Sequence, residues 1–262
     1  MWLPVPLPSL VAVAPDGSCA PLRAARQRMA VAIRAAALDA EPAAALAALA
    51  AVSEYEAMLT ANRGSPAGVV WDTPNGAVCS FAREGEVAML AHARAALCVR
   101  AATTTLDGDA RCEYLAEALA AVRAGPRCAA VSAREDVLCA LLHAEFVSVT
   151  LPLNAGAWRA VHALATAGAK GLAAAGDAAG TAAAEALAAE ALARACEAAA
   201  EERYKAAKFA EAAELGAAGR PAFAERAEQL HAMAAQRSLP VRKRSASEMI
   251  DMLPPAAALP SL

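Results

Sequence analysis

The sequence has few aromatic residues and lacks the short motifs that identify common catalytic and metal-binding sites. Only 4% of its 262 residues are Phe, Trp or Tyr, although 58% are hydrophobic, because alanine is so frequent. Alanine favours helices but buries little surface, so a stable core requires many helices that share small contacts. No GxSxG, GxxxxGK[ST], GxGxxG, CxxC or HExxH motif occurs. The sequence therefore gives no support to the hydrolase, nucleotide-binding and zinc-site classes that these motifs mark.

Disulfides, excess charge and membrane spans are also not expected. The seven cysteines are odd in number and have no framework spacing, which indicates reduced thiols in a cytoplasmic setting. The net charge of −3 gives no general attraction to nucleic acid or to an anionic membrane. No window of about 18 residues looks both uncharged and strongly apolar, as a spanning helix needs. The N-terminal stretch MWLPVPLPSL has no basic residue, and its prolines oppose a helical signal peptide.

Helical periodicity runs through most of the chain. In Glu84–Leu106, apolar residues recur every three or four positions and alanines cover much of the rest, as expected of a central helix in an all-α domain. Proline, glycine and capping residues place the ends of the other helices. The short connections predict antiparallel helical hairpins with a tetratricopeptide-like core. The expected helices are 21–39, 41–62, 84–106, 110–123, 132–150, 154–174, 181–215 and 221–236.

Two regions are predicted to be non-helical. Alternating prolines make residues 1–18 extended, either as polyproline II or as an edge strand. The insertion near 66–81 contains Asn75-Gly76, a tight-turn signal, between two short apolar runs that predict a small β-hairpin or loop. The predicted organisation is thus an extended segment (1–18), a helical domain (19–237) and a basic, proline-rich tail (238–262).

Few side chains are candidates for catalysis or for metal binding. Cys139 and His143 lie four residues apart on one helix face and could form half of a metal site, but no second pair has ligand spacing. A core cysteine beside a structural histidine is the simpler interpretation. The carboxylate pairs are expected on solvated helix faces: Glu84/Glu86, Glu201/Glu202 and Glu211/Glu214. We therefore expect no catalytic residue, no metal site and no cofactor.

The tail carries a basic cluster beside two serines. Its members are Arg242, Lys243, Arg244, Ser245 and Ser247, and each serine has an arginine three residues before it. This pattern is compatible with a phosphorylation site, a nuclear-import patch or a contact with acidic lipid headgroups. A simple solvated tail is the alternative.

The order of features between Leu22 and Leu253 resembles a compact, divergent Bro1 domain, the helical module of Alix-like endosomal-sorting proteins. The N-terminal LPVPLP resembles the family's opening strand segment, and VVWD at 69–72 resembles its F-x-W-x-D-like turn. EVAMLAHARAALCVRAA at 86–102 is similar in spacing to its central helix, without the characteristic Phe and Asn. YLAEALAAVRA, AREDVLCALLHAEFVSVT and EERYKAAKFAEAAELG resemble later family helices, and RSLPVRKRSASEMIDMLPP resembles the segment that folds back at the end.

This resemblance implies a non-catalytic protein-interaction adaptor in endosomal or vesicle sorting. Its partner would be the amphipathic C-terminal helix of an ESCRT-III-type subunit, bound in an apolar groove of the middle helices. The corresponding partner-binding residues here are Val147, Leu151, Val161 and Leu164, with Ser148 where the family has a large aromatic. A cytoplasmic, endosome-associated protein is expected, with at most peripheral membrane contact and no nucleic-acid or small-molecule ligand.

Three other interpretations remain open. A generic tetratricopeptide-like or 14-3-3-like scaffold would bind a different peptide, and a concave face rich in Arg and Lys would indicate phosphopeptide binding. An enzyme would need a concave pocket in which titratable groups with perturbed pKa values converge. A structural subunit of a larger assembly would expose extensive alanine-rich faces.

Overall fold

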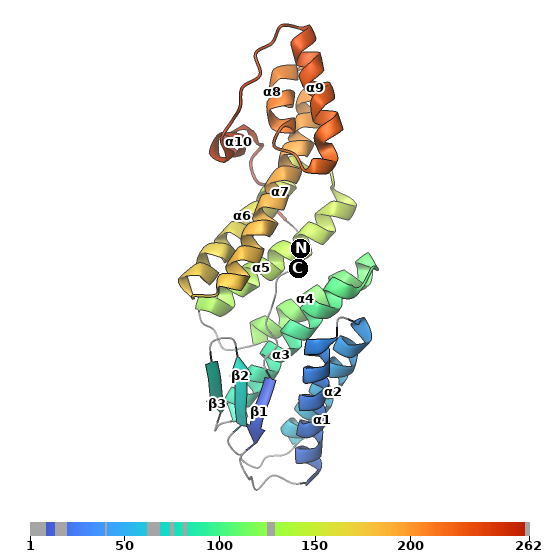
Figure 1. Ribbon diagram of the computed structural model, residues 1–262, viewed down its shortest axis with the longest axis vertical. Helices are drawn as coiled ribbons and strands as arrows, with labels where there is room; N and C mark the ends of the chain where they lie inside the picture. The colour runs from blue at the N-terminus through green and yellow to red at the C-terminus, as the bar shows by residue number, and fades with distance from the viewer. Residues whose placement is uncertain are drawn as a thin grey trace. The chain divides into compact units, whose positions relative to one another are not determined.

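The computed structural model describes residues 9–13, 20–39, 41–61, 69–73, 76–80, 83–124 and 129–259. It describes side chains in 20–39, 41–61, 85–124 and 132–259. The chain forms two compact units, 2–138 (the N-terminal unit) and 139–262 (the C-terminal unit). This division falls within the helical domain predicted at 19–237, and residues 238–259 belong to the C-terminal unit. Helices dominate both units, which confirms the predicted all-α class (Figure 1).

In the N-terminal unit, helices that follow one another in sequence pack against one another. They are α1 (Ala20–Leu38), α2 (Pro42–Ala61), α3 (Arg83–Thr104) and α4 (Gly108–Ala124). Leu90 and Leu97 of α3 are fully buried, as expected of a central helix, whereas Val87 is 38% exposed. At the start of α4, the Asp107 carboxylate accepts a hydrogen bond from the Asp109 N–H, so Asp107 caps the helix.

A small antiparallel sheet accompanies these helices. Its strands are β1 (Ser9–Val13), β2 (Val69–Thr73) and β3 (Gly76–Ser80), in the order β1-β2-β3 (Figure 1). The pairing of β2 with β3 confirms the predicted hairpin. β1 pairs with β2 as an edge strand, one of the two forms predicted for the N-terminal segment. The rest of 1–18 lies outside the described residues.

Helix α2 is long and apolar enough to cross a membrane by length and composition, contrary to the expectation from sequence. Core helices can have the same length and apolar composition. Here α2 packs on both α1 and α3, and its buried face includes Leu49, Val52 and Tyr55. The structure therefore uses α2 as a packed helix within the N-terminal unit.

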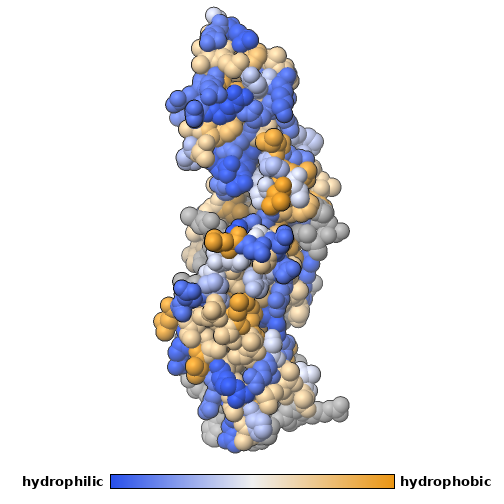
Figure 2. All heavy atoms as spheres, turned by 90° about the vertical axis from the view of Figure 1, so that its right-hand side faces the viewer, coloured by the Kyte–Doolittle hydropathy of each residue, from blue (hydrophilic) through white to orange (hydrophobic). Residues whose placement is uncertain are grey.

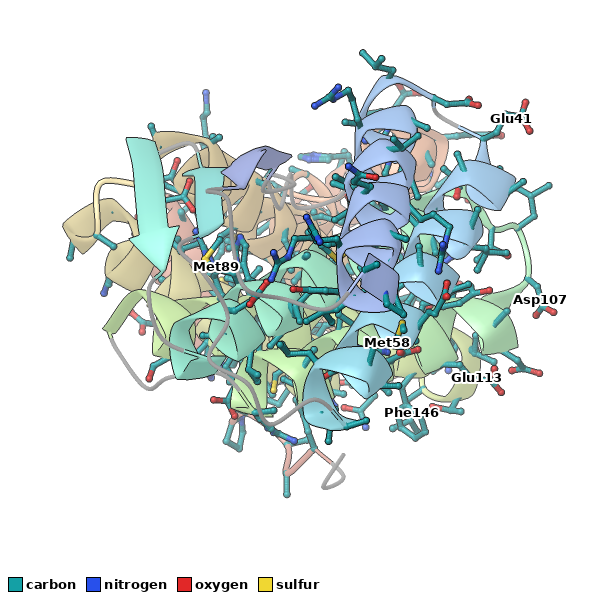
Figure 3. All side chains as sticks on the ribbon, turned by 90° about the horizontal axis from the view of Figure 1, so that it is seen from below. Glu41, Met58, Met89, Asp107, Glu113 and Phe146 are labelled. Atoms are coloured by element: carbon teal, nitrogen blue, oxygen red, sulfur yellow. The ribbon has the colours of Figure 1, made fainter. Side chains whose placement is uncertain are left out.

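A charged cluster lies in the core of the N-terminal unit. Arg26 and Glu86 are each 1% exposed, and Tyr55 is completely buried. The Arg26 Nε donates a hydrogen bond to the Tyr55 hydroxyl (2.7 Å), and that hydroxyl donates to the Glu86 carboxylate. The predicted solvent exposure of Glu86 is therefore wrong. Figure 3 shows the contrast with Glu41, Asp107 and Glu113, which point outward.

The C-terminal unit is a series of helices that begins within α5 (Ala129–Thr150). It continues through α6 (Ala155–Ala174), α7 (Ala178–Lys205), α8 (Phe209–Gly216), a short 3₁₀ turn (Pro221–Phe223), α9 (Ala224–Gln236) and α10 (Ala246–Met252). The Asn154 side chain caps α6 by accepting a hydrogen bond from the Ala157 N–H, at the position where this helix was predicted to begin. The helix predicted to begin at Ser132 instead begins at Ala129, so Ser132 lies inside α5.

The long helix predicted for 181–215 is interrupted. It ends at Lys205, and Ala207 adopts a left-handed conformation (φ 59°) before α8 begins. Tyr204 and Phe209 meet edge to face across this turn, with ring centroids 5.9 Å apart. The turn therefore produces a helix-turn-helix where one continuous helix was predicted.

Candidate functional site

The four residues predicted to bind a partner do not form one open groove. Val147 and Val161 are completely buried in the core of the C-terminal unit, so neither has surface to offer a partner. Leu164 is half-buried and packs against the same core, whereas Leu151 is 42% exposed. Ordinary core packing thus accounts for both valines.

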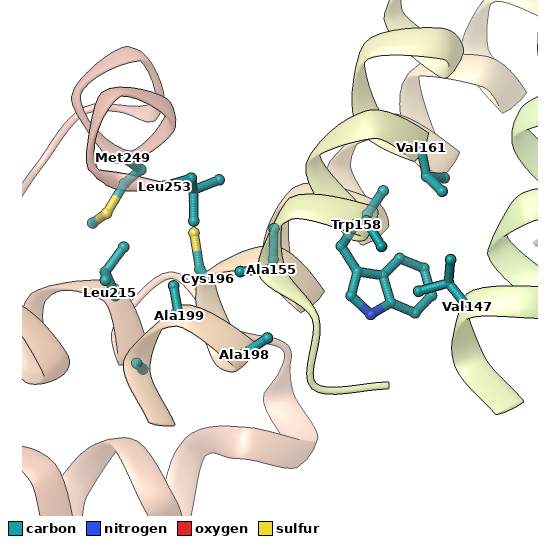
Figure 4. Packing of buried hydrophobic residues seen from close by; sticks show 14 of the residues in the cluster. Val147, Ala155, Trp158, Val161, Cys196, Ala198, Ala199, Leu215, Met249 and Leu253 are labelled. Carbon is teal, nitrogen blue, oxygen red and sulfur yellow. The ribbon is translucent and has the colours of Figure 1, made fainter. Parts of the chain in front are cut away.

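Trp158 lies in the same core as these valines. Figure 4 shows its indole beside Val147, with Val161 nearby, and all three residues belong to one buried cluster. The indole N–H donates a hydrogen bond to the Pro152 carbonyl (3.1 Å), and the Arg194 guanidinium lies 4.8 Å from the ring centroid. A large aromatic therefore does enter this region, but from α6 and as a core residue.

An open groove runs beside α6, on the other side of that helix from its core contacts. It has a volume of about 740 Å³. One wall is a stripe of α6, and the other is the C-terminal segment. We call this the α6 groove and define it by Arg159, His162, Ala163, Thr166, Ala167, Lys170, Ile250, Leu253, Pro255 and Ala256.

The α6 groove combines a small apolar floor with basic ends. Ala163 and Ala167 are exposed along α6, and the described lining includes no carboxylate. Arg159 and Lys170 are eleven residues apart on α6, which corresponds to about 16 Å along a helix. The groove can therefore accept about three turns of a helix that carries small or medium apolar residues on one face and acidic residues beside them.

A smaller groove lies on the other side of residues 254–257. It has a volume of about 500 Å³. The α5–α6 turn, which includes Leu151, Pro152 and Leu153, lines it together with Glu202 of α7 and the C-terminal segment. Leu153 is 60% exposed, so this groove adds apolar surface near one predicted residue. Figure 2 shows one face of the protein, on which pale hydrophobic areas alternate with hydrophilic ones.

Within the predicted tail, the described residues 238–259 include the basic cluster and pack against the C-terminal unit. Glu214 of α8 is 4% exposed, and it accepts hydrogen bonds from the Arg242 backbone N–H (3.0 Å) and the Arg244 Nε (2.8 Å). This carboxylate raises the pKa of Arg244, mainly through the hydrogen bond. The predicted solvent exposure of Glu214 is therefore wrong, and Arg244 has an internal partner rather than a freely solvated side chain.

The two serines occupy different positions. Ser245 caps α10 and forms a capping box with Glu248, in which each side chain accepts from the other residue's backbone N–H. The bonds from Ser245 hold the pKa of the Glu248 carboxyl below its usual range. Ser247 is exposed in the first turn of α10, and Lys243 is exposed in the irregular segment before it. The phosphorylation, import and lipid hypotheses stay predictions.

The residues with the most perturbed pKa values are buried rather than gathered in a groove. Burial raises the pKa of the Cys98 thiol to about 12 and that of the Cys196 thiol to about 11. Burial also lowers the pKa of His143, whose Nδ1 has no hydrogen-bond partner in the described structure. Among the described residues, Cys139 and His143 belong to no group of three or more potential metal ligands.

Sequence reasoning missed several charged residues that hold the C-terminal segment. Arg203 and Arg159 donate hydrogen bonds to backbone carbonyls of this segment. Glu214 accepts hydrogen bonds from a backbone N–H and from an arginine side chain of the same segment. The sequence carries no signal for Glu214, because its burial beside Ala212 and Ala213 on α8 follows only from the tertiary structure. Because α8 is buried along most of its length, its polar residues need partners inside the protein.

Comparison of this chain with protein-family models, curated proteins and solved structures gave no match.

Proposed function

We propose that this protein is a non-catalytic protein-interaction adaptor that binds an amphipathic helix of a partner. The observation that carries the proposal is the α6 groove, which has an apolar floor, basic ends and no carboxylate in its described lining. Such a surface complements a helix with a narrow apolar face and acidic flanks. The resemblance to a Bro1 domain supplies the specific candidate, the C-terminal helix of an ESCRT-III-type subunit, with a role in endosomal sorting.

The distribution of titratable groups supports an adaptor over an enzyme. The strongly raised thiol pKa values belong to Cys98 and Cys196, which are completely buried and do not line the α6 groove. A phosphopeptide-binding scaffold of the 14-3-3 type is less well supported. Arg159 and Lys170 are too far apart along α6 to hold one phosphate together.

The test is a titration of the purified protein with a fluorescent peptide from an ESCRT-III C-terminal helix. Wild type is compared with Ala163→Glu and Lys170→Glu, which place negative charge in the groove without altering a buried residue. Ala189→Glu, at an exposed position of α7 outside the groove lining, is the matched control. We expect micromolar binding by wild type and by the control, weakened at least tenfold in both groove variants.

Two results would overturn the proposal. One is the absence of binding by wild type, and the other is unchanged binding by Ala163→Glu. Circular dichroism would confirm that every variant is folded. Val161→Asp is unsuitable for this purpose, because it would place a charge in the core rather than in the groove.

A further inference from the structure

The C-terminal unit already contains one amphipathic helix bound in a groove, its own α10. Met249 and Leu253, four residues apart, are each 5% exposed and belong to the core cluster. Figure 4 shows them above Leu215 and Cys196, with Ala199 nearby. The opposite side of α10, which includes Ser247 and Asp251, is exposed. We call the surface that receives α10 the α10 seat: Ala155, Cys196, Ala199, Glu214 and Leu215, with Arg159 and Arg203.

The α10 seat holds both ends of the helix with charges of the appropriate sign. Before the first turn, the buried Glu214 accepts from the Arg242 N–H and the Arg244 Nε. After the last turn, Arg203 donates to the Met252 carbonyl (3.2 Å). Arg159 donates through Nη1 to the next two carbonyls, at 3.0 and 2.8 Å. An acid that binds the segment before the helix and arginines that bind carbonyls at and after its end distinguish the two ends, so the seat fixes the direction of its helix.

Backbone contact extends the seat beyond α10. The Ala257 N–H donates to the Gly156 carbonyl (2.9 Å). A Cβ added at Gly156 would lie 2.8 Å from the Pro255 carbonyl oxygen, closer than real Cβ contacts allow. Glycine at this position therefore permits the close approach of an extended segment that follows the helix.

α10 depends on the seat for its stability. It has seven residues, and isolated helices of this length are marginal in water even with a capping box. Residues 237–245, which connect it to α9, contain no helix or strand. The docked state is thus an intramolecular complex between a short helix and a preformed site, and such a complex can open without unfolding the other helices.

We infer that the α10 seat is a binding site for amphipathic helices and that α10 is its resident, competing ligand. A partner helix that displaces it would carry the same features: a Ser or Thr cap with Glu three residues later, large apolar residues at Met249- and Leu253-equivalent positions, and an arginine before the cap. Ile250 and Leu253 also line the α6 groove, so displacement would enlarge that groove. The inference deepens the proposed function and rests on it for the identity of the partner.

The test uses the full chain and a fluorescent peptide of residues 239–257. The double variant Met249→Asp/Leu253→Asp releases α10 from its seat, and we expect it to bind the wild-type peptide. Wild-type protein should bind at least tenfold more weakly, because its tethered α10 competes at high effective concentration. A peptide with Met249→Asp is the matched control and should not bind. The milder pair Met249→Ala/Leu253→Ala replaces the double variant if that fails to fold by circular dichroism.

Cys196 provides a second readout, because its thiol is completely buried beneath α10. Alkylation of Cys196 should be slow in wild type, at least tenfold faster in the released variant, and slow again when the peptide is added. A folded, released variant that binds no peptide would overturn the inference, as would equal peptide affinity for wild type and variant. Binding of this peptide without binding of the ESCRT-III peptide would preserve the seat and reject the proposed partner.

Discussion

The two units bury charge in different ways. In the N-terminal unit, Arg26 and Glu86 are each 1% exposed, and the Tyr55 hydroxyl joins them by hydrogen bonds. In the C-terminal unit, the buried acid Glu214 meets Arg244, which remains 28% exposed. Removing both charges of a pair from water costs more than removing one, and the cost is recovered only with well-formed hydrogen bonds. The first pair is therefore an integral part of a helical core, whereas the second attaches a later segment that can detach.

The largest expected effect is on the buried pair. Glu86→Gln removes the negative charge of a buried ion pair and should destabilise the N-terminal unit by about 3–5 kcal/mol. Urea denaturation followed by circular dichroism measures the loss. The matched control is Glu54→Gln, because the Arg28–Glu54 pair is 55% and 50% exposed and should contribute about 0–1 kcal/mol. Equal effects of the two variants would remove the distinction between buried and exposed pairs.

A smaller and local effect is expected at the attached segment. Glu214→Gln weakens the hydrogen bonds to Arg242 and Arg244 and should cost about 1.5–3 kcal/mol in the docking of residues 238–259. Amide hydrogen exchange should accelerate at Leu253 and Ala257 while exchange in α7 stays slow. If amide exchange accelerated uniformly throughout the C-terminal unit, the segment would unfold together with that unit and would not detach separately.

Buried His143 should make the stability of the C-terminal unit depend on pH. Burial lowers its pKa in the folded state, so the unfolded chain binds a proton at higher pH, near the ordinary value of 6.5. The stabilisation is complete above that pH and declines as the pH falls below it toward the folded-state pKa. Urea denaturation at pH 7.5 and 5.5 should show this decline in wild type and a smaller one in His143→Gln. The exposed His231 offers the control, because His231→Gln should leave the wild-type dependence intact.

The smallest expected effect concerns left-handed turns in the C-terminal unit. Ala207 has a φ of 59°, a conformation that glycine adopts with less strain, so Ala207→Gly should stabilise the unit by about 0.5–1 kcal/mol. Gly176→Ala is the inverse control, because Gly176 has a φ of 75° and nothing lies within 4 Å of an added Cβ. Thermal unfolding should therefore shift upward for the first variant and downward for the second.

Most helices could be predicted from the sequence because their signals are local. Proline at position 42, Asn154 as a cap and the spacing of apolar residues in 84–106 act through neighbouring residues. The Asn75-Gly76 signal likewise predicted the β2–β3 hairpin. The break after Lys205 was missed because alanine continues through it, and alanine gives no sign of a left-handed turn.

The surfaces that bear on function could not be predicted in the same way. Helical periodicity shows which residues share a face, but it does not show whether another element covers that face. Val147 and Val161 are buried in the same core cluster as Trp158, and Leu253 is buried where Arg159 and Arg203 hold the chain that carries it. By itself the sequence determined the helices, the hairpin and the all-α class through local propensity and spacing. Only the tertiary structure decided which charges are buried and which grooves stay open, because both depend on contacts between residues distant in the sequence.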